Sequence, residues 1–283
     1  MDPKNSEESV LTLEKLAKRV DIKVQGEQQV WHVWNPGASE RVLLLHGGSG
    51  SWTHWLKNIR MLSQNREVWA LDLPGFGESG LPPKAIDVDD LVLPVMEGMK
   101  EILGSSPIDV LGFSFGGLLA GYIAATDETR IRKLILIGVP ALGLTNTPLT
   151  LRGLRPEMNT MEIQEVHRNN LKVMMIADER VIDKQTIQIQ LHNVERDRLK
   201  RRRIARSAVM LELQKKWTCP VYTVWGELDG LYKGQLDQVR QRFQNCDLRE
   251  FHVIPNAGHW VQYEQPNAFN RCIMKILDSH IAH

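Results

Sequence analysis

The sequence of 283 residues contains only three cysteines, Cys219, Cys246 and Cys272, and none belongs to a C-x-x-C pair. An odd number of cysteines without that spacing argues against a disulfide framework, so we expect reduced, packed thiols. Residues 1–20 hold several acidic side chains and no apolar stretch of the kind that secretory signal peptides contain. These features predict a cytoplasmic protein.

Long apolar runs and a charge excess are absent too. The longest apolar run extends only from Leu134 to Leu144 and contains Pro140, whereas a membrane-spanning helix needs about 20 apolar residues. With 35 basic and 34 acidic side chains the net charge is +1, so no overall field favours nucleic acid. We expect a small-molecule substrate, and no nucleic-acid or membrane partner; a homodimer stays open.

Motifs for metals and phosphates are also missing. The chain has no H-E-x-x-H motif and no Cys/His spacing typical of metal ligands. It contains no G-x-x-x-x-G-K-[ST] loop that would hold a nucleotide phosphate. We therefore expect no metal and no cofactor.

Short apolar runs rich in Val, Ile and Leu alternate with segments of helical spacing. Such runs are typical of strands buried on both faces of a parallel sheet. The predicted strands are Val42–Leu45, Val68–Leu73, Ile108–Leu111, Leu134–Val139, Val221–Trp225 and Phe251–Ile254, and the predicted helices between them are Trp55–Leu62, Leu91–Leu103, Gly116–Ala125 and Leu236–Phe243. An antiparallel hairpin around Gly26 precedes them, and a short helix capped by Ser9 comes earlier still. The alternation predicts an α/β fold with a mostly parallel, doubly wound sheet.

The alternation stops after the sixth predicted strand. Residues 141–215 show no convincing strand and are predicted as helices, including Met161–Ala177 and Asp183–His192. They hold 14 basic and 9 acidic side chains, so their net charge is +5, whereas that of the rest of the chain is −4. They also contain half of the ten methionines. We predict an α/β core formed by residues 1–140 and 216–283, with a helical cap at 141–215. The basic run Lys200–Arg203 is interpreted as a solvated helix face of that cap rather than a nucleic-acid site.

The clearest motif is G-x-S-x-G, which spans Gly112–Gly116 between a predicted strand and a predicted helix. In that context the motif is typical of a sharp strand-to-helix turn that presents its serine above the sheet. The helix N-terminus there favours negative charge. Ser114 is therefore the candidate nucleophile.

A serine hydroxyl needs a base, and the base needs an orienting acid. For this turn the expected chain order is serine, then an acid, then histidine. Asp229 and His259 each follow the end of a predicted strand, where open α/β sheets place their sites. Ser114, Asp229 and His259 are the predicted catalytic residues, with Glu227 an open alternative to Asp229.

An oxyanion formed on the substrate needs backbone donors. We expect one from Phe115, directly after the nucleophile, and one from Gly48 in the run His46-Gly47-Gly48-Ser49-Gly50. His46 is expected to bond to loop backbone rather than to move protons. Phe113, Trp260 and Ser49 are the predicted substrate-pocket residues.

These motifs together resemble the α/β-hydrolase superfamily over nearly the whole chain. The matching segments are His46-Gly47-Gly48, Asp72-Leu73-Pro74-Gly75-Phe76-Gly77-Glu78-Ser79, the turn at Ser114, Trp225-Gly226-Glu227-Leu228-Asp229 and Gly258-His259-Trp260. Within the superfamily, the stretch from His259 to Asn270 resembles the meta-cleavage-product hydrolases, which cut carbon–carbon bonds in dienoates. That family usually has Asn before the serine, where this chain has Phe113, and uses a cap arginine. The candidates for that arginine here are Arg180, Arg196 and Arg206.

The function we expect is two-step acyl transfer on a small carboxylic ester or related carbonyl substrate. The first alternative is hydrolysis of a carbon–carbon bond in a meta-cleavage dienoate. An alternative of another class is a small-ligand receptor that retains the triad. Haloalkane dehalogenases and epoxide hydrolases resemble this fold but have Asp at the position of the turn serine. Ser114 therefore argues against both.

Overall fold

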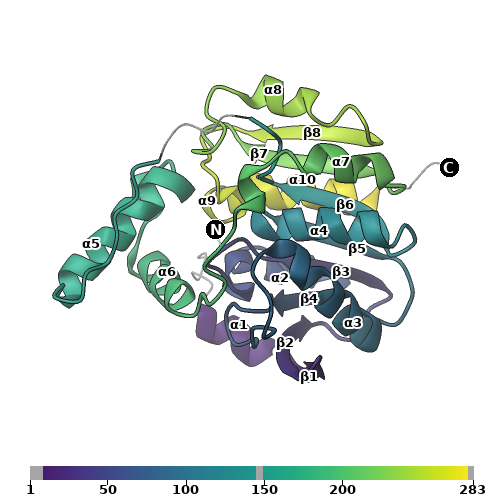
Figure 1. The fold of residues 1–283 in the computed structure, drawn as a ribbon, viewed down its shortest axis with the longest axis horizontal. Coiled ribbons are helices and arrows are strands. Elements are labelled where there is room, and N and C mark those ends of the chain that lie inside the picture. The colour runs from purple at the N-terminus through teal and green to yellow at the C-terminus, as the bar shows by residue number, and fades with distance from the viewer. Residues whose placement is uncertain (1–8, 145–148, 280–283) are drawn as a thin grey trace, which may run out of the picture.

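The computed structural model describes residues 9–144 and 149–279 (Figure 1). Within them, one eight-stranded sheet has the order β1-β2-β4-β3-β5-β6-β7-β8. The strands are β1 (Lys18–Val24), β2 (Glu27–Trp34), β3 (Glu40–Leu45), β4 (Arg66–Asp72), β5 (Ile108–Phe113), β6 (Ile131–Ile137), β7 (Val221–Gly226) and β8 (Leu248–Ile254). All neighbours from β4 to β8 are parallel, whereas β1–β2 and β2–β4 are antiparallel. This confirms the predicted mostly parallel sheet.

The antiparallel hairpin lies at the sheet edge, as predicted. Its two loop residues, Gln25 and Gly26, have φ of 53° and 86°. Two successive left-handed residues give the turn type whose twist matches that of the flanking strands. The hairpin therefore extends the parallel sheet by two strands on the β4 side.

Helices cover both faces of the sheet (Figure 1). They are α1 (Val10–Leu16), α2 (Ile59–Leu62), α3 (Val92–Leu103), α4 (Phe115–Thr126), α5 (Thr160–Asn170), α6 (Lys184–Glu195), α7 (Met210–Leu213), α8 (Leu236–Gln241), α9 (Val261–Glu264) and α10 (Pro266–Asp278). Two apolar clusters form the core: one includes residues of α3, α4 and α8, and the other includes residues of α2, α9 and α10. All six residues of β5 are buried, which places the strand before Ser114 at the centre of the core.

The stretch between β6 and β7, residues 138–220, is called the helical insertion below. It contains α5, α6 and α7, and its described residues include no strand. The predicted helix Met161–Ala177 is α5 continued by one π-helical turn, Leu171–Met175. In Figure 1, α5 extends away from the sheet while α6 lies beside α1.

Two local predictions were wrong. Trp55–Leu62 is not one helix, because a 3₁₀ helix, Trp52–Trp55, comes before the short α2. Residues 197–203 are irregular, so the basic run does not form a helix face. Nor is that run uniformly solvated: Arg202 turns inward and its side chain is only 26% exposed.

No helix among the described residues is both long and apolar enough to cross a membrane.

Candidate active site

Ser114 lies at the junction of β5 and α4 in a strained backbone conformation. Its φ is 49° and its ψ is −114°, a region that residues with a Cβ rarely occupy. The turn is tight because α4 starts directly after it. A Cβ on Gly116 would lie 2.4 Å from the carbonyl oxygens of Leu45 and His46. Glycine at this position therefore lets α4 pack against the end of β3 and raise the Ser114 hydroxyl above the sheet.

The structure brings Ser114, His259 and Asp229 together from three loops. His259 Nε2 lies 2.9 Å from Ser114 Oγ, and His259 Nδ1 lies 2.8 Å from Asp229 Oδ2. His259 and Asp229 are fully buried, whereas Ser114 is half-buried. Asp229 Oδ1 accepts the N–H of Leu231, which fixes the carboxylate. This chain of hydrogen bonds can take a proton from the serine oxygen.

Glu227, the open alternative for the acid, points elsewhere. Its Oε2 accepts the backbone N–H of Asn256 at 3.1 Å, and its side chain is exposed. Because Asp229 faces the imidazole and Glu227 does not, the geometry resolves the choice that the sequence left open.

Gly138, at the end of β6, makes room for the imidazole. A Cβ there would lie 3.0 Å from His259 Cε1, and the φ of Gly138 is 54°. Both observations favour glycine at this position. No sequence pattern indicates this role, because Gly138 lies inside an apolar run.

The loop after β3 carries the predicted donor Gly48. His46 holds this loop through backbone, as expected: its Nδ1 bonds to the Gly47 carbonyl at 2.7 Å, and its Nε2 accepts the N–H of Leu73 at 2.9 Å. Burial lowers the pKa of His46 to about 4, which keeps the ring neutral. Phe115, the other predicted donor, is the first residue of α4, where N–H groups have no partner within the helix.

His54 is a buried residue of this site that the sequence patterns did not identify. Its Nδ1 accepts the N–H of Gly47 at 3.2 Å, and its carbonyl accepts the indole N–H of Trp260 at 2.9 Å. Burial lowers its pKa well below the usual value. His54 thus joins the loop after β3 to the loop that carries His259. Its only signal is a position between two tryptophans, Trp52 and Trp55.

The three predicted pocket residues take up different positions. Phe113 is buried with its ring centre 5.1 Å from that of His259. Trp260 is also fully buried and stacks on Tyr263 at 4.0 Å. The hydroxyl of Ser49 donates a hydrogen bond to Asp197 at 2.6 Å. Phe113 therefore packs beside the imidazole of His259, Trp260 packs against His54 and Tyr263, and Ser49 contacts the helical insertion.

Of the arginines considered for a cap role, two make their contacts within the helical insertion. Arg180 is exposed and pairs with Asp178. Arg196 lies beside His192, with Nη1 3.3 Å from Nδ1. Arg206 is exposed as well. Arg202, from the run that we expected to be solvated, faces inward instead.

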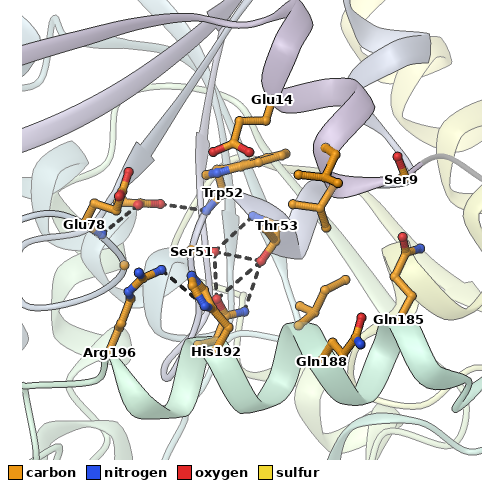
Figure 2. Close-up of a pocket in the computed structure, with 16 residues that line it drawn as sticks. Ser9, Glu14, Ser51, Trp52, Thr53, Glu78, Gln185, Gln188, His192 and Arg196 are labelled. Carbon is orange, nitrogen blue, oxygen red and sulfur yellow. Dashed lines mark hydrogen bonds between the residues drawn. The ribbon is translucent and has the colours of Figure 1, made fainter.

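A cavity of about 480 Å³ lies behind the loop after β3, between α1, α6 and the 3₁₀ helix Trp52–Trp55 (Figure 2). Its walls include Glu14, Trp52, Glu78, His192 and Arg196. None of Ser114, Asp229 and His259 lines it. It is therefore separate from the hydrogen-bonded chain described above.

Residues 9–144 and 149–279 contain no group of three or more His, Cys, Asp or Glu side chains arranged to hold a metal ion.

Comparison with known proteins identifies the family. Residues 42–271 match the model of a family described as "Alpha/beta hydrolase family". The chain belongs to the alpha/beta hydrolase family. This confirms the resemblance, the fold and the prediction that the chain is a hydrolase.

Curated relatives of this hydrolase include two named for dienoate substrates. The 2-hydroxy-6-oxo-6-phenylhexa-2,4-dienoate hydrolase of Burkholderia cepacia is 27% identical, over 87% of this chain and 90% of the relative. The 2-hydroxy-6-oxononadienedioate/2-hydroxy-6-oxononatrienedioate hydrolase of Comamonas testosteroni is also 27% identical, with the same coverage. Both relatives are therefore matched nearly end to end.

Solved structures share the fold. A meta-cleavage product hydrolase from Pseudomonas fluorescens superposes with a TM-score of 0.74 at 23% identity, covering 92% of this chain and 97% of that one. A carboxylesterase from Bacillus subtilis gives 0.76 at 18% identity, covering 94% and 93%. The same fold thus carries both chemistries considered above.

Proposed function

We propose that this hydrolase cleaves a small carboxylic ester through a covalent acyl-enzyme, with Ser114 as nucleophile, His259 as base and Asp229 as orienting acid. The observation that carries the proposal is the unbroken pair of hydrogen bonds from Ser114 to His259 and from His259 to Asp229, at 2.9 and 2.8 Å. The strained backbone of Ser114 supports it, because such strain concentrates at functional positions.

The first step is attack of Ser114 Oγ on the carbonyl carbon while His259 Nε2 takes the hydroxyl proton. Asp229 keeps the other ring proton on Nδ1 and stabilises the imidazolium that forms. His259 then gives its proton to the leaving alkoxide, and the acyl group stays on Ser114. In the second step His259 takes a proton from water, the resulting hydroxide attacks the acyl carbon, and the carboxylic acid leaves as Ser114 recovers its proton.

We propose the N–H groups of Phe115 and Gly48 as the donors to the oxyanion in both steps. The position of Phe115 at the first residue of α4 supports its role, because the helix N-terminus favours negative charge. Gly48 belongs to the loop after β3, whose neighbouring residues are held by His46 and His54. Removing one such donor typically lowers kcat by about 10²–10³.

A second candidate is hydrolysis of a carbon–carbon bond in a dienoate, and the names of the curated relatives favour it. Phe113 distinguishes the two candidates, because an apolar ring precedes the serine where the dienoate hydrolases usually have Asn. The ring cannot donate a hydrogen bond to a substrate oxygen.

We also propose that residues 141–215 form the cap over the substrate site. The contacts of Ser49 with Asp197 and of Trp260 with Met175 support this, since both join site loops to the helical insertion. A cytoplasmic location is proposed from the three cysteines, which are all free thiols.

The test is one substrate panel with purified wild-type and Ser114→Ala protein. The panel contains p-nitrophenyl esters of graded acyl length and a 2-hydroxy-6-oxo-dienoate. We expect multiple turnovers of a short ester by the wild type and none by Ser114→Ala, with the same circular dichroism for both. Turnover of the dienoate alone would replace the first candidate by the second. Single-turnover hydrolysis with a large ligand-induced rise in Tm would instead indicate a receptor, and unchanged turnover by Ser114→Ala would refute the nucleophile.

A further inference from the structure

Two side chains of the helical insertion form a closed set of hydrogen bonds with the loop after β3. Ser49 Oγ donates to Asp197 Oδ2 at 2.6 Å, and Arg202 Nη2 donates to the same oxygen at 2.6 Å. Arg202 Nη2 also donates to Ser49 Oγ at 3.2 Å. Each member therefore bonds to the other two, and the loop is joined to the insertion at the residue that follows Gly48.

A second set of hydrogen bonds joins the same loop to α6. Ser51 Oγ donates to Asn193 Oδ1 at 2.8 Å, and Asn193 Nδ2 donates to Thr53 Oγ1 at 3.1 Å. Figure 2 shows the bonds of Ser51 and Thr53 to this helix at the wall of the cavity. The insertion thus holds the loop over residues 49–53 and not at a single point.

Burial makes the contact of Arg202 with Asp197 hard to break. Asp197 is 4% exposed, and its Oδ1 has no hydrogen-bond partner among the described residues. A buried carboxylate that loses its cation is strongly destabilised. Arg202 is therefore held inward while Asp197 stays buried.

The guanidinium also touches the predicted oxyanion donor. A Cβ built on Gly48 would lie only 2.5 Å from Arg202 Nη1, so Arg202 lies directly against this glycine. The next residue, Ser49, has a φ of 49°, a left-handed conformation that costs free energy in a residue with a side chain. The hydrogen bond to Asp197 and the contact with Arg202 thus stabilise a backbone that is unfavourable by itself.

We propose that Arg202 and Asp197 are positioning residues, which hold the Gly48 N–H where the oxyanion forms. This inference rests on the proposed function, because it assumes that Ser114 attacks a carbonyl. Neither side chain contacts the reacting atoms in this role; they act through Ser49 and the backbone of Gly48. The oxyanion site is then complete only while the helical insertion is docked on the core.

The test compares Arg202→Met, Arg202→Lys and Asp197→Asn with Arg203→Met, an exposed neighbour of the same charge. Each is assayed with a neutral p-nitrophenyl ester and with a trifluoromethyl ketone inhibitor of the same acyl group. The ketone forms a tetrahedral oxyanion on the serine, so its Ki reports the donors. Displacing one donor rather than removing it should lower kcat by about 30-fold, below the full effect of a lost donor.

We expect Arg202→Met and Asp197→Asn to lower kcat with little change in KM, and to raise the Ki of the ketone in proportion to the loss in kcat/KM. Arg202→Lys should recover part of the loss, and Arg203→Met should match the wild type. Wild-type kcat and Ki in both Arg202→Met and Asp197→Asn would overturn the inference. A loss confined to anionic esters would also overturn it, because Arg202 would then contact the substrate.

Two further measurements keep the test decisive. Ser49→Ala leaves the Arg202–Asp197 pair intact and removes only the loop's bond to it, so it should lower kcat without lowering Tm appreciably. The rate at which diisopropyl fluorophosphate labels Ser114, followed by mass spectrometry, needs no known substrate. No labelling of the wild type would refute the proposed function. Equal labelling rates in wild type and Arg202→Met would refute only the positioning role.

Discussion

The carboxylate oxygen Oδ2 of Asp229 lies 2.8 Å from Nδ1 of His259. Both side chains are fully buried, so no solvent competes for this contact. Glu227 lies only two residues earlier in the chain, yet its carboxylate bonds to the backbone of Asn256 instead. The two acids form a natural matched pair, because they share a loop and differ in whether they reach the imidazole.

Asp229→Asn should lower kcat by about 10⁴-fold with little change in KM, because the amide no longer selects the tautomer that accepts the serine proton. Glu227→Gln should stay within about twofold of the wild type, since removing a surface charge has little effect. Steady-state kinetics on the best ester of the panel would measure both. Equal losses in the two variants would contradict the assignment of Asp229.

Acid should destabilise the fold through His46. Its Nε2 accepts the N–H of Leu73, and burial lowers its pKa to about 4. A histidine in the unfolded chain has a pKa of about 6.5. Between these values the unfolded chain binds the proton and the folded chain does not, so the free energy of unfolding falls as the pH falls from about 6.5 to 4. The loss from this one residue is at most about 3 kcal/mol, and it is absent above pH 6.5.

Other buried groups modify this slope. Burial also lowers the pKa of His32 to about 4, which acts in the same direction. Burial raises the pKa of Asp72 to about 6, so this carboxyl favours the folded state more as the pH falls, and partly offsets the histidines. Urea unfolding at pH 7, 6, 5 and 4.5 would show the net loss. His46→Gln should be less stable than the wild type at pH 7 but show a shallower decline; parallel curves for the two proteins would exclude His46 as a source.

The local parts of the site could be predicted from sequence. The turn at Ser114 is specified almost entirely by Gly112 and Gly116, which lie between a buried strand and a helix. The order of Ser114 and His259 along the chain and their positions after strands are also local signals. The choice of Asp229 over Glu227 needed the structure, because the direction of each side chain depends on where the loop packs against His259.

The contacts made by the helical insertion could not be predicted. Arg202 belongs to a run of four basic residues, a pattern typical of a solvated surface, yet its guanidinium lies against Gly48. Its partner Asp197 precedes it by only five residues, but their common partner Ser49 is far away in the chain. Such contacts depend on how the insertion docks on the core, which no local pattern specifies. The same holds for His54, whose burial comes from packing against Trp260 and Phe113.

Glu264 should be important for both stability and activity, because its buried carboxylate joins the His259 loop to the insertion. Oε2 accepts the N–H of Gly258 at 2.7 Å and that of Ala177 at 3.1 Å, and Oε1 accepts the N–H of Asp178 at 2.7 Å. Glu264→Gln puts an amide N–H against one of these donors. The free energy of unfolding should fall by about 2–4 kcal/mol, given the strength of hydrogen bonds to charged groups.

The matched control for Glu264 is the next residue. Gln265→Ala removes one exposed bond, at 3.3 Å to the Asn256 carbonyl. It should change stability by less than about 0.5 kcal/mol, as surface substitutions usually do. Urea unfolding and kcat would be measured for both variants. A Glu264→Gln protein as stable and as active as Gln265→Ala would show that the carboxylate does not hold the two segments together.

The strain at Ser114 predicts that glycine is more stable than alanine at this position. Both substitutions remove the hydroxyl and its bond to His259, so they differ only in the Cβ. At φ 49° and ψ −114° that Cβ is unfavourable, and Ser114→Gly should exceed Ser114→Ala in free energy of unfolding by about 1–2 kcal/mol. Ser63 provides the control, because its φ is −79° and a side chain is tolerated there.

At Ser63 we expect the alanine variant to be at least as stable as the glycine variant. Glycine relieves no backbone strain there, and it increases the conformational entropy of the unfolded chain, which lowers stability. Urea unfolding of the four variants would therefore show opposite orders at the two positions. The same order at both would mean that the backbone at Ser114 carries no strain. With opposite orders, the conformation that exposes the hydroxyl lowers the stability of the fold, and the turn keeps serine for its chemistry rather than for its packing.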